Sequence, residues 1–379
     1  MTARLLLSVI PFLGCLYILA GLVLVGRYAR RGSHPPATFP AVTLLKPLHG
    51  AEPELFENLT SFCTQDYPGP IQLVFGVADP ADPAVKVVER LPAVPGRTID
   101  LVIDARRMGS NPKMANLINM SGAIRNEVVV LSDSDMRVPP DYLRRVVGEL
   151  QRPGTGAVTC LYHGVPTGGI WSRLSALGID THFLPGVVTG LTLGLAKPCF
   201  GSTIAMERRT FDAIGGAEAF ADQLADDHAM GAAVRALGLD VAVPPFVVDH
   251  LSSEDSVRTL WAHELRWART VKSVDPVGYA GSILTHGFPL ALIAWALGGG
   301  LPALALAALA LLGRIGLCRR LERAYDLPRY PYWLIPARDL LSFAVYMTSW
   351  LGRGVNWRGH LFHLVPDGTL VTERRPPSP

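Results

Sequence analysis

Acidic residues follow directly after an apolar run in the middle of this 379-residue sequence. The stretch VVVLSDSD over 128–135 ends on Asp133 and Asp135, which are separated by one serine. Two carboxylates this close repel each other unless they bind a hard cation or share a proton. Carboxylate oxygens are suitable ligands for Mg²⁺ or Mn²⁺, and either ion binds the phosphates of a nucleotide. The run therefore predicts a metal-bound nucleotide at this position, with an ordinary Asp- and Ser-rich turn as the alternative.

Acidic residues also stand at the boundaries of two other segments. Asp79 ends the apolar run IQLVFGVAD over 71–79, and Asp226 and Asp227 open the sequence DDHAMGAAVRALG. A carboxylate can act as a general base, which takes a proton from an attacking hydroxyl group. The alternative for the pair at 226–227 is a helix N-cap, because aspartate is favoured there.

The elements that must position these acids alternate between strand-like and helix-like patterns. The expected strands cover 41–47, 71–79, 98–105 and 128–135, and the expected helices cover 52–68, 83–91, 111–124 and 140–151. This alternation predicts an α/β fold with a Rossmann-like, mostly parallel sheet and helices on both faces. Ligands bind at the carboxyl ends of the strands in such sheets. Asp79, Asp133 and Asp135 all come at those ends.

Long apolar segments flank this region on both sides. Residues 5–25 carry no charge and precede Arg27, Arg30 and Arg31, which is typical of a membrane helix with a cytoplasmic end. A cleaved signal peptide is the alternative. Residues 282–318 are long enough for two helices joined by a turn at 298–300, and a third segment over 340–352 either spans the membrane or lies at its surface. We therefore expect an integral membrane protein, in bacteria one of the inner membrane, with its catalytic domain on the cytoplasmic side.

Composition excludes several other classes. The net charge of +3 is too mild to indicate a nucleic-acid partner. Five scattered cysteines without a C-x-x-C pair argue against a disulfide or zinc scaffold and agree with a reduced, cytosolic domain. The expected division is an anchor over 1–30, a catalytic domain over 40–275, a C-terminal membrane region over 282–352 and a tail over 353–379.

The order of these motifs, together with several local strings, resembles a known family. The strings are KPLHGAEPELFENLTSFCTQDYP, VADPADPA, GSNPKMANL over 109–117, FGSTIAM over 200–206 and HELRW over 263–267. They resemble the GT-A-fold inverting glycosyltransferases of the ceramide glucosyltransferase family, and most closely its bacterial hopanoid-biosynthesis branch. The resemblance implies a GT-A catalytic domain that moves a hexose from a UDP-sugar to the hydroxyl group of a membrane lipid.

The resemblance also implies roles for the acidic residues. Asp79 matches the position that contacts the uracil, whereas Asp133 and Asp135 match the motif that holds ribose and diphosphate through Mg²⁺ or Mn²⁺. Asp227 matches the catalytic base, and Asp226 beside it is a supporting residue. Inversion needs one such base, because the acceptor oxygen loses its proton as it attacks the anomeric carbon.

Other positions carry weaker expectations. HELRW departs from the family's (Q/R)-x-x-R-W, because His263 stands in the first position, whereas Arg266 and Trp267 match. These three are expected at the diphosphate and the acceptor, and a purely interfacial anchoring helix is the alternative. Lys113 in NPKMANL is expected to contact phosphate or ribose. The apolar segment 183–198 is expected at a lipid-facing mouth, or else as an ordinary core helix.

Several functions stay open at this level. The sugar is glucose or N-acetylglucosamine, and the acceptor is a hopanoid or a ceramide, with the local strings favouring the hopanoid branch. A processive polysaccharide synthase shares the acids, although such enzymes generally carry more membrane spans. A membrane protein that only binds a nucleotide-sugar is a further alternative, and a haloacid-dehalogenase-like phosphatase is disfavoured because Met136 replaces the Thr or Val of that motif.

Overall fold

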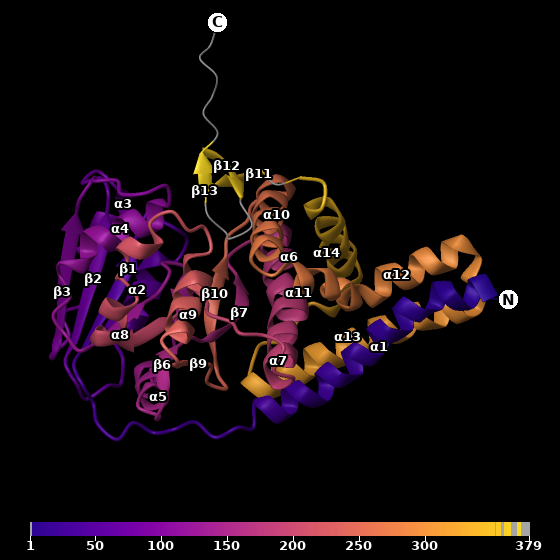
Figure 1. The fold of residues 1–379 in the computed structure, drawn as a ribbon, viewed down its shortest axis with the longest axis horizontal. Coiled ribbons are helices and arrows are strands. Elements are labelled where there is room, and N and C mark those ends of the chain that lie inside the picture. The colour runs from indigo at the N-terminus through magenta and orange to yellow at the C-terminus, as the bar shows by residue number, and fades with distance from the viewer. Residues whose placement is uncertain (1, 353, 358–359, 365–369, 373–379) are drawn as a thin grey trace, which may run out of the picture.

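The structure, a computed structural model, describes residues 2–352, 354–357, 360–364 and 370–372. An α/β region lies at one side of the molecule, and long helices extend away from it at the other (Figure 1). Shorter helices lie between the two parts. The proline-rich stretch at the end of the expected tail, 374–379, falls outside the described residues.

The central sheet has seven strands in the order β3-β2-β1-β4-β8-β6-β9. Strands β3, β2, β1 and β4 are parallel to one another, β8 runs antiparallel to both β4 and β6, and β9 is parallel to β6. The strands are β1 (Val42–Pro47), β2 (Ile71–Val77), β3 (Arg97–Ile103), β4 (Val128–Leu131), β6 (Thr155–Val158), β8 (Ile204–Glu207) and β9 (Asp240–Ala242). The predicted mostly parallel sheet is therefore confirmed.

Helices cover both faces of this sheet, which explains why its central strand β4 is apolar at every position. Val128 and Val130 of β4 pack on the side of α2 (Leu55–Cys63), α3 (Pro83–Val88) and α5 (Tyr142–Leu150). Val129 and Leu131 pack on the side of α4 (Pro112–Ser121), α8 (Arg208–Ala213) and α9 (Asp226–Ala236). A strand buried on both faces has no polar positions to alternate, so it appears as a continuous apolar run.

The expected elements in this region are present, but several are shorter than predicted. The strand expected over 128–135 ends at Leu131, so Asp133 and Asp135 lie in the turn before β5 (Met136–Arg137). The helix expected over 52–68 ends at Cys63, five residues before Pro68. Ser132 is the last buried residue before the first acid, which agrees with a turn that leaves the sheet here.

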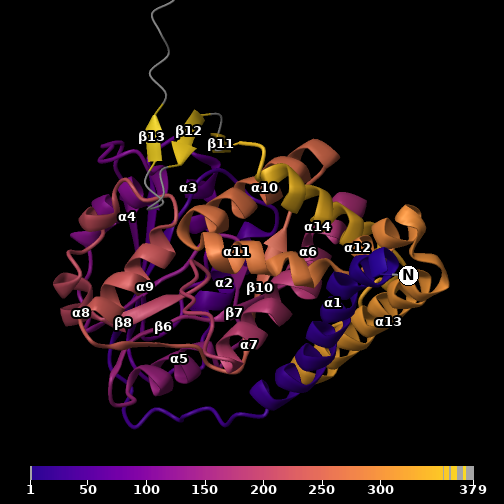
Figure 2. The ribbon, with the colours of Figure 1, turned by 45° about the vertical axis from the view of Figure 1, so that its right-hand side comes forward.

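A second, smaller sheet has the order β5-β10-β7, in which β7 (Leu161–Pro166) is parallel to β10 (Val247–Ser252). From β7 the chain continues through α6 (Ile170–Gly178), η1 (Ile179–Phe183) and α7 (Leu184–Thr192), and η2 (Glu218–Phe220) precedes α9. After β10 come α10 (Val257–Val274), α11 (Pro276–Gly281) and η3 (Ser282–His286). Figure 2 shows these helices between the sheets and the long helices.

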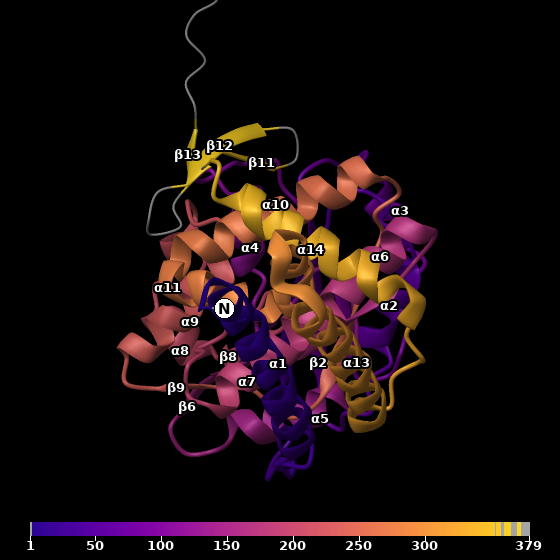
Figure 3. The ribbon, with the colours of Figure 1, turned by 90° about the vertical axis from the view of Figure 1, so that its right-hand side faces the viewer.

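The long helices are α1 (Thr2–Tyr28) and α13 (Gly300–Tyr325), which lie side by side (Figure 3). Helix α12 (Gly287–Ala294) packs against both of them. The turn predicted at 298–300 is present, beside η4 (Trp295–Gly299), and Gly298 and Gly300 adopt φ values of 92° and 65°. Such values favour glycine. Helix α1 approaches η3 and α12 closely, because a Cβ atom on Gly14 would lie 2.9 Å from the Cα of Gly287.

Among the residues that the structure describes, two stretches are long and apolar enough to cross a membrane, Ser8–Tyr28 and Pro276–Tyr325. Most of the third predicted segment, 340–352, lies in α14 (Ile335–Ser349), which follows η5 (Tyr332–Leu334). Helix α14 packs against α10, and its first turns bury Arg338 and Asp339. In the region expected to be a tail, β11 (Gly354–Trp357), β12 (His360–Leu364) and β13 (Leu370–Thr372) form a small antiparallel sheet. The sequence analysis did not predict it.

The segment 183–198 divides into two parts with different environments. Its helix α7 buries Leu184 and Val188 against residues of α1 and α13. The loop that follows exposes Leu193 and Leu195, at 55% and 78% of their surface. The helix is thus a core element at the base of the long helices, and only the loop tip presents apolar surface outward.

Candidate active site

Four carboxylates from two distant parts of the chain gather at the carboxyl edge of the central sheet. Asp133 and Asp135 lie in the turn after β4, and Asp226 and Asp227 form the first turn of α9. We call these four residues the acidic cluster. Residues about 90 positions apart meet here because β8, which precedes α9, pairs directly with β4.

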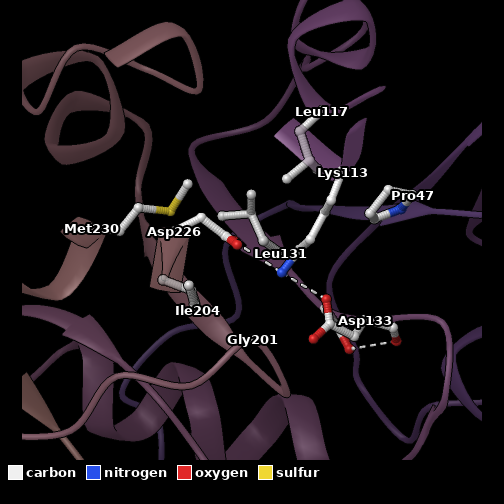
Figure 4. Close-up of a pocket in the computed structure, with 10 residues that line it drawn as sticks. Pro47, Lys113, Leu117, Leu131, Asp133, Gly201, Ile204, Asp226 and Met230 are labelled. Atoms are coloured by element: carbon white, nitrogen blue, oxygen red, sulfur yellow. Dashed lines mark hydrogen bonds and ion pairs between the residues drawn. The ribbon is translucent and has the colours of Figure 1, made fainter. Parts of the chain in front are cut away.

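Lys113 joins the two halves of the acidic cluster. Its Nζ atom lies 2.8 Å from Oδ1 of Asp133 and 2.9 Å from Oδ2 of Asp226 (Figure 4). The side chain comes from the first turn of α4, where Asn111 caps the helix by accepting hydrogen bonds from the backbone N–H groups of Lys113 and Met114. Burial lowers the pKa of Lys113, but the charges of Asp133 and Asp226 outweigh it and raise that pKa overall. Lys113 is therefore a permanent cation between two acids.

Gly201 provides a second link between the halves. Its N–H group donates to Oδ2 of Asp227 at 3.0 Å, and its carbonyl oxygen accepts from the N–H group of Asp133 at 3.0 Å. A Cβ atom at this position would lie 2.4 Å from Oδ2 of Asp133. Only glycine leaves room for that carboxylate, which gives the FGST string a physical reason.

Lys46 is a functional candidate that the sequence analysis did not identify. It is completely buried at the end of β1 and donates to the Asp133 carbonyl oxygen at 2.7 Å and to Ser132 Oγ at 3.2 Å. Its Nζ atom lies 3.6 Å from the centre of the Phe62 ring. Burial lowers its pKa to about 7 against the opposing effect of Asp133 and Asp135. The signal in the sequence was a lysine inside an otherwise apolar strand, AVTLLKP.

Burial and mutual repulsion perturb the acids themselves. The pKa of Asp227 is raised from 3.8 to about 6, chiefly by burial and then by the charge of Asp226. The pKa of Asp135 is also raised to about 6, by burial and by Asp133. A carboxylate with a raised pKa is a stronger base than an exposed one, so Asp227 is suited to accept a proton near neutral pH.

The donor set of Asp133 and Asp135 fits a divalent metal ion that also binds phosphate. Oδ1 of Asp135 is buried and accepts no hydrogen bond within the described part of the chain, whereas Oδ2 lies 3.4 Å from Nε2 of His250. Among the described residues, no group of three or more His, Cys, Asp or Glu could hold a metal by itself. Mg²⁺ and similar ions commonly take one or two carboxylates and complete their shell with phosphates and water.

Aromatic rings lie in a row beside Asp135, and we call Tyr162, His250, Trp267 and His263 the aromatic wall. His250 stacks on Tyr162 with ring centres 5.4 Å apart, and Trp267 of α10 meets His250 edge-on at 5.7 Å. His263 meets Trp267 at 4.5 Å, as their spacing of four residues on a helix predicts. Nδ1 of His263 also hydrogen-bonds to Glu254. His250 and Glu254 were not identified from the sequence, because neither has a motif spacing around it.

Asp79 and Arg266, the remaining predicted site residues, are not part of the acidic cluster. Asp79 lies two residues after β2 at the same edge of the sheet, and its exposed side chain accepts a hydrogen bond from the N–H group of Ala81. Arg266 is half-buried on α10, next to Trp267. The described ion pairs bring Asp133, Lys113 and Asp226 together but do not include Asp79.

A mostly parallel sheet with acids at its carboxyl edge is the arrangement of the GT-A glycosyltransferases, and a solved structure shares this fold. The mannosyltransferase PcManGT from Pyrobaculum calidifontis, solved in complex with GDP-Man and Mn²⁺, aligns with a TM-score of 0.53 and 22% identity over 91% of this chain and 99% of its own. At that identity the likeness shows the fold alone.

The chain belongs to glycosyl transferase family 21, whose sequence model matches residues 6–370. Ceramide glucosyltransferase 1 of Caenorhabditis elegans is 25% identical over 237 residues, which are 62% of this chain and 50% of that protein. Ceramide glucosyltransferase 3 of the same organism is 23% identical over 95% of this chain and 81% of its own length. The chain thus spans about half of the first relative and most of the second.

Proposed function

We propose that this protein is a membrane-bound inverting glycosyltransferase that moves a hexose from a UDP-sugar to the hydroxyl group of a membrane lipid. The observation that carries the proposal is the acidic cluster, in which two carboxylates suited to a metal-bound diphosphate lie beside a carboxylate suited to act as a base. Ceramide glucosyltransferases among the relatives support the choice of a sugar donor and a lipid acceptor.

The proposed chemistry assigns one role to each part of the site. Asp227 takes the proton of the acceptor hydroxyl group while that oxygen forms a bond to the anomeric carbon and the bond from this carbon to the diphosphate oxygen breaks. The departing UDP carries away the electron pair. Asp133 and Asp135 would hold a Mg²⁺ or Mn²⁺ ion, which would supply positive charge for the diphosphate. Lys113, Arg266 and His263 add cationic or hydrogen-bonding groups near it.

Asp79 is proposed to contact the uracil, because it lies at the same edge of the sheet as the acidic cluster. Trp267 is proposed to pack against the donor or the acceptor, since it belongs to the aromatic wall beside Asp135. Both roles come from the resemblance of VADPADPA and HELRW to the family motifs.

The membrane arrangement supports a lipid acceptor. Helices α1 and α13 pack together, and their arginine-rich ends lie next to the catalytic region, where Tyr28 donates a hydrogen bond to the Val243 carbonyl oxygen. Arg30, Arg31, Arg319, Arg320 and Arg323 gather near this end. Positive charge beside a membrane span favours the cytoplasmic side. We therefore propose that the acidic cluster lies on the cytoplasmic side, close to the bilayer.

The proposal leaves the choice of sugar and lipid to experiment. We expect purified protein to convert UDP-glucose or UDP-N-acetylglucosamine, together with a ceramide or a hopanoid alcohol, into a glycolipid identified by mass spectrometry. The local strings favour the hopanoid with N-acetylglucosamine, whereas the relatives named above are ceramide glucosyltransferases.

The decisive variant is Asp227→Asn, which removes the base and keeps its shape. It should lower turnover by about 10²–10⁴-fold, the usual contribution of a general base, while UDP binding stays within a few-fold of the wild type. Asp222→Asn is a matched control, because this acid is exposed and its partner in the described part of the chain is Ser110. Wild-type turnover in Asp227→Asn would contradict the proposed mechanism, and absence of glycolipid with all four substrate pairs would contradict the function.

A further inference from the structure

Helix α14 arranges its residues in the opposite way to a helix that faces water. Its two charged residues, Arg338 and Asp339, point inward and are almost completely buried. A helix on a water-facing surface normally turns its charged and polar side outward. The exposed residues between 335 and 351 are instead all apolar, namely Ala337, Leu340, Met347, Trp350 and Leu351. Apolar surface of this kind marks a contact with a partner or a membrane.

Most of these exposed residues lie on one side of the helix. They are three, four or seven positions apart, and we call this set the apolar stripe: Ala337, Leu340, Met347 and Leu351. A tryptophan stands near each end of the stripe, Trp333 in η5 and Trp350 after α14, and 70% of the Trp333 surface is exposed. Tryptophan is enriched at the boundary between the hydrocarbon of a membrane and water. The stripe with its two tryptophans therefore matches a lipid surface.

The inner side of α14 is attached to the catalytic region at both ends of the helix. Near its start, Arg338 forms an ion pair with Glu264 of α10. At its end, the hydroxyl group of Ser349 hydrogen-bonds to Tyr279 of α11 at 2.8 Å, and Lys272 of α10 donates to the Ser349 carbonyl oxygen. The 15 residues of α14 extend about 22 Å, which is less than the roughly 30 Å of a hydrocarbon core. Both ends therefore stay on the same side of a bilayer.

The outer side of α14 faces the same way as the long helices. Figure 3 views the molecule from the side toward which α1 and α13 extend, and α14 runs across this side in front of α10 and α6. Figure 1 agrees, because it places α14 between those two helices and α12. Phe343 of α14 also meets His286, the residue directly before α12, with ring centres 5.6 Å apart. The apolar stripe thus continues the surface of the candidate membrane helices.

We propose that the apolar stripe lies among the acyl chains of the leaflet nearest the catalytic region, so that α14 is immersed in the bilayer surface without crossing it. Continuity with α1 and α13 favours lipid over a second copy of this chain as the cover. The ion pair of Arg338 with Glu264 then fixes α10, which also carries Trp267, at the bilayer surface. This inference goes beyond the proposed reaction and does not depend on it.

The test measures the depth of the stripe in phosphatidylcholine vesicles that contain the full-length protein. The five native cysteines are buried, so a nitroxide spin label attaches selectively to an exposed cysteine introduced by Leu340→Cys or Met347→Cys. Collisions with oxygen, which enters hydrocarbon, and with a water-soluble nickel chelate give the depth of each label. Both labels should lie about 5–10 Å below the headgroup boundary and at similar depth. A crossing helix would separate them by about 10 Å and would overturn the proposal.

Two further variants of similar exposure calibrate the measurement. Leu304→Cys on α13 reports a membrane helix, and Leu237→Cys, directly after α9, reports water. Labels on the stripe that meet the nickel chelate as often as the Leu237→Cys label would show that α14 faces water, which contradicts the proposal. Ala337→Cys replaces either stripe variant that does not fold.

The same spectra distinguish lipid from a second copy of this chain. A second copy over the stripe would shield the labels from both reagents and would broaden their spectra through spin–spin interaction, whatever the excess of lipid. That result would also overturn the proposal. The measurement uses no sugar donor and no acceptor, so failure of the proposed function leaves its outcome unchanged.

Discussion

Two regions of this molecule bring several charged side chains together, and they differ in whether those charges are paired with opposite charges. The acidic cluster holds Asp133, Asp135, Asp226 and Asp227 around one bridging lysine. The other region, which we call the helix-junction network, consists of Arg314, Asp339, His182, Arg338 and Glu264, where α13, η1, α14 and α10 meet.

In the helix-junction network the charges are paired. Nε2–H of His182 donates to Oδ1 of Asp339 at 2.9 Å, and Nε of Arg314 lies 3.4 Å from the same oxygen. Arg314 also donates to the Thr181 carbonyl oxygen at 2.8 Å. Burial raises the pKa of Asp339, but Arg314 and His182 overcome it and lower the value to about 2. The acid is ionised at every physiological pH.

In the acidic cluster the acids outnumber the cations that reach them. Asp135 and Asp227 have pKa values raised to about 6, because burial and like charge are not offset by the lysines. A buried carboxylate is costly when it is not paired. In the helix-junction network, buried charges of opposite sign stabilise the packing of the helices. In the acidic cluster, the excess of negative charge indicates a binding site for a ligand of positive charge.

The largest expected effect is on the balanced side. Asp339→Asn leaves Arg314 buried without its counter-charge and should reduce the free energy of unfolding by about 3–5 kcal/mol. Thermal unfolding of purified protein in detergent measures this change. Asp326→Asn is the control, because Asp326 has a φ of 54° that asparagine adopts equally well. Equal melting temperatures for both variants would remove the distinction between the two regions.

The next effect concerns the cation within the acidic cluster. Lys113→Met removes the positive charge between Asp133 and Asp226, so their repulsion should reduce stability by about 2 kcal/mol in the absence of metal. Lys86→Met, at an exposed position of α3, should change it by less than about 0.5 kcal/mol. Added Mn²⁺ should recover part of the loss in Lys113→Met, as a rise in melting temperature. A loss no greater than that of the control would contradict the bridging role of Lys113.

The most direct contrast with Asp339 is the same substitution at Asp135. The raised pKa means that this group favours folding below about 3.8 and that the benefit is lost as pH rises through about 6. Asp135→Asn should therefore raise the melting temperature of the metal-free protein at pH 7.5, although solvent screening at this partly exposed side chain keeps the effect below that of Asp339→Asn. It should also abolish the stabilisation that Mn²⁺ gives the wild type. A destabilised variant at this pH would show that Asp135 is balanced like Asp339.

The smallest effect is the pH dependence of turnover. Asp227 can accept a proton only when ionised, and its pKa is about 6, so kcat should fall about tenfold per pH unit below that value and be level above it. The profile is measured with saturating donor and acceptor between about pH 4.5 and 8. A limb centred near the ordinary value of 3.8 would mean that the base is a different, exposed carboxylate.

The elements of the fold could be predicted to a large extent from the sequence. The apolar runs at 41–47 and 71–79 predict buried strands, because burial on both faces excludes most polar residues. The uncharged stretch at 5–25 predicts a long apolar helix. Boundaries were less accurate: the run at 128–135 was predicted as one strand, although the sheet ends at Leu131. The acids themselves leave the sheet, since a turn exposes them to a ligand.

The site could be predicted only in part. Asp133, Asp135 and Asp227 were found because motifs surround them, and the pairing of β4 with β8 brings them together. Lys46, His250 and Glu254 were missed, because a lone lysine, histidine or glutamate has no spacing that points to a partner. Lys46 is 86 and 87 residues from its two hydrogen-bond partners, His250 is 115 residues from Asp135, and Glu254 is nine residues from His263. Only the packing of the chain decides which of these residues meet.

The sequence by itself determined the alternation of strands and helices, the apolar ends and the identity of the acids, because each depends on local patterns of burial and charge. The tertiary structure decided which charges are balanced. Arg314 forms an ion pair with Asp339, whereas Oδ1 of Asp135 is buried and accepts no hydrogen bond in the described residues. Electrostatic energy depends on distance in space and on burial, and neither can be read along the chain.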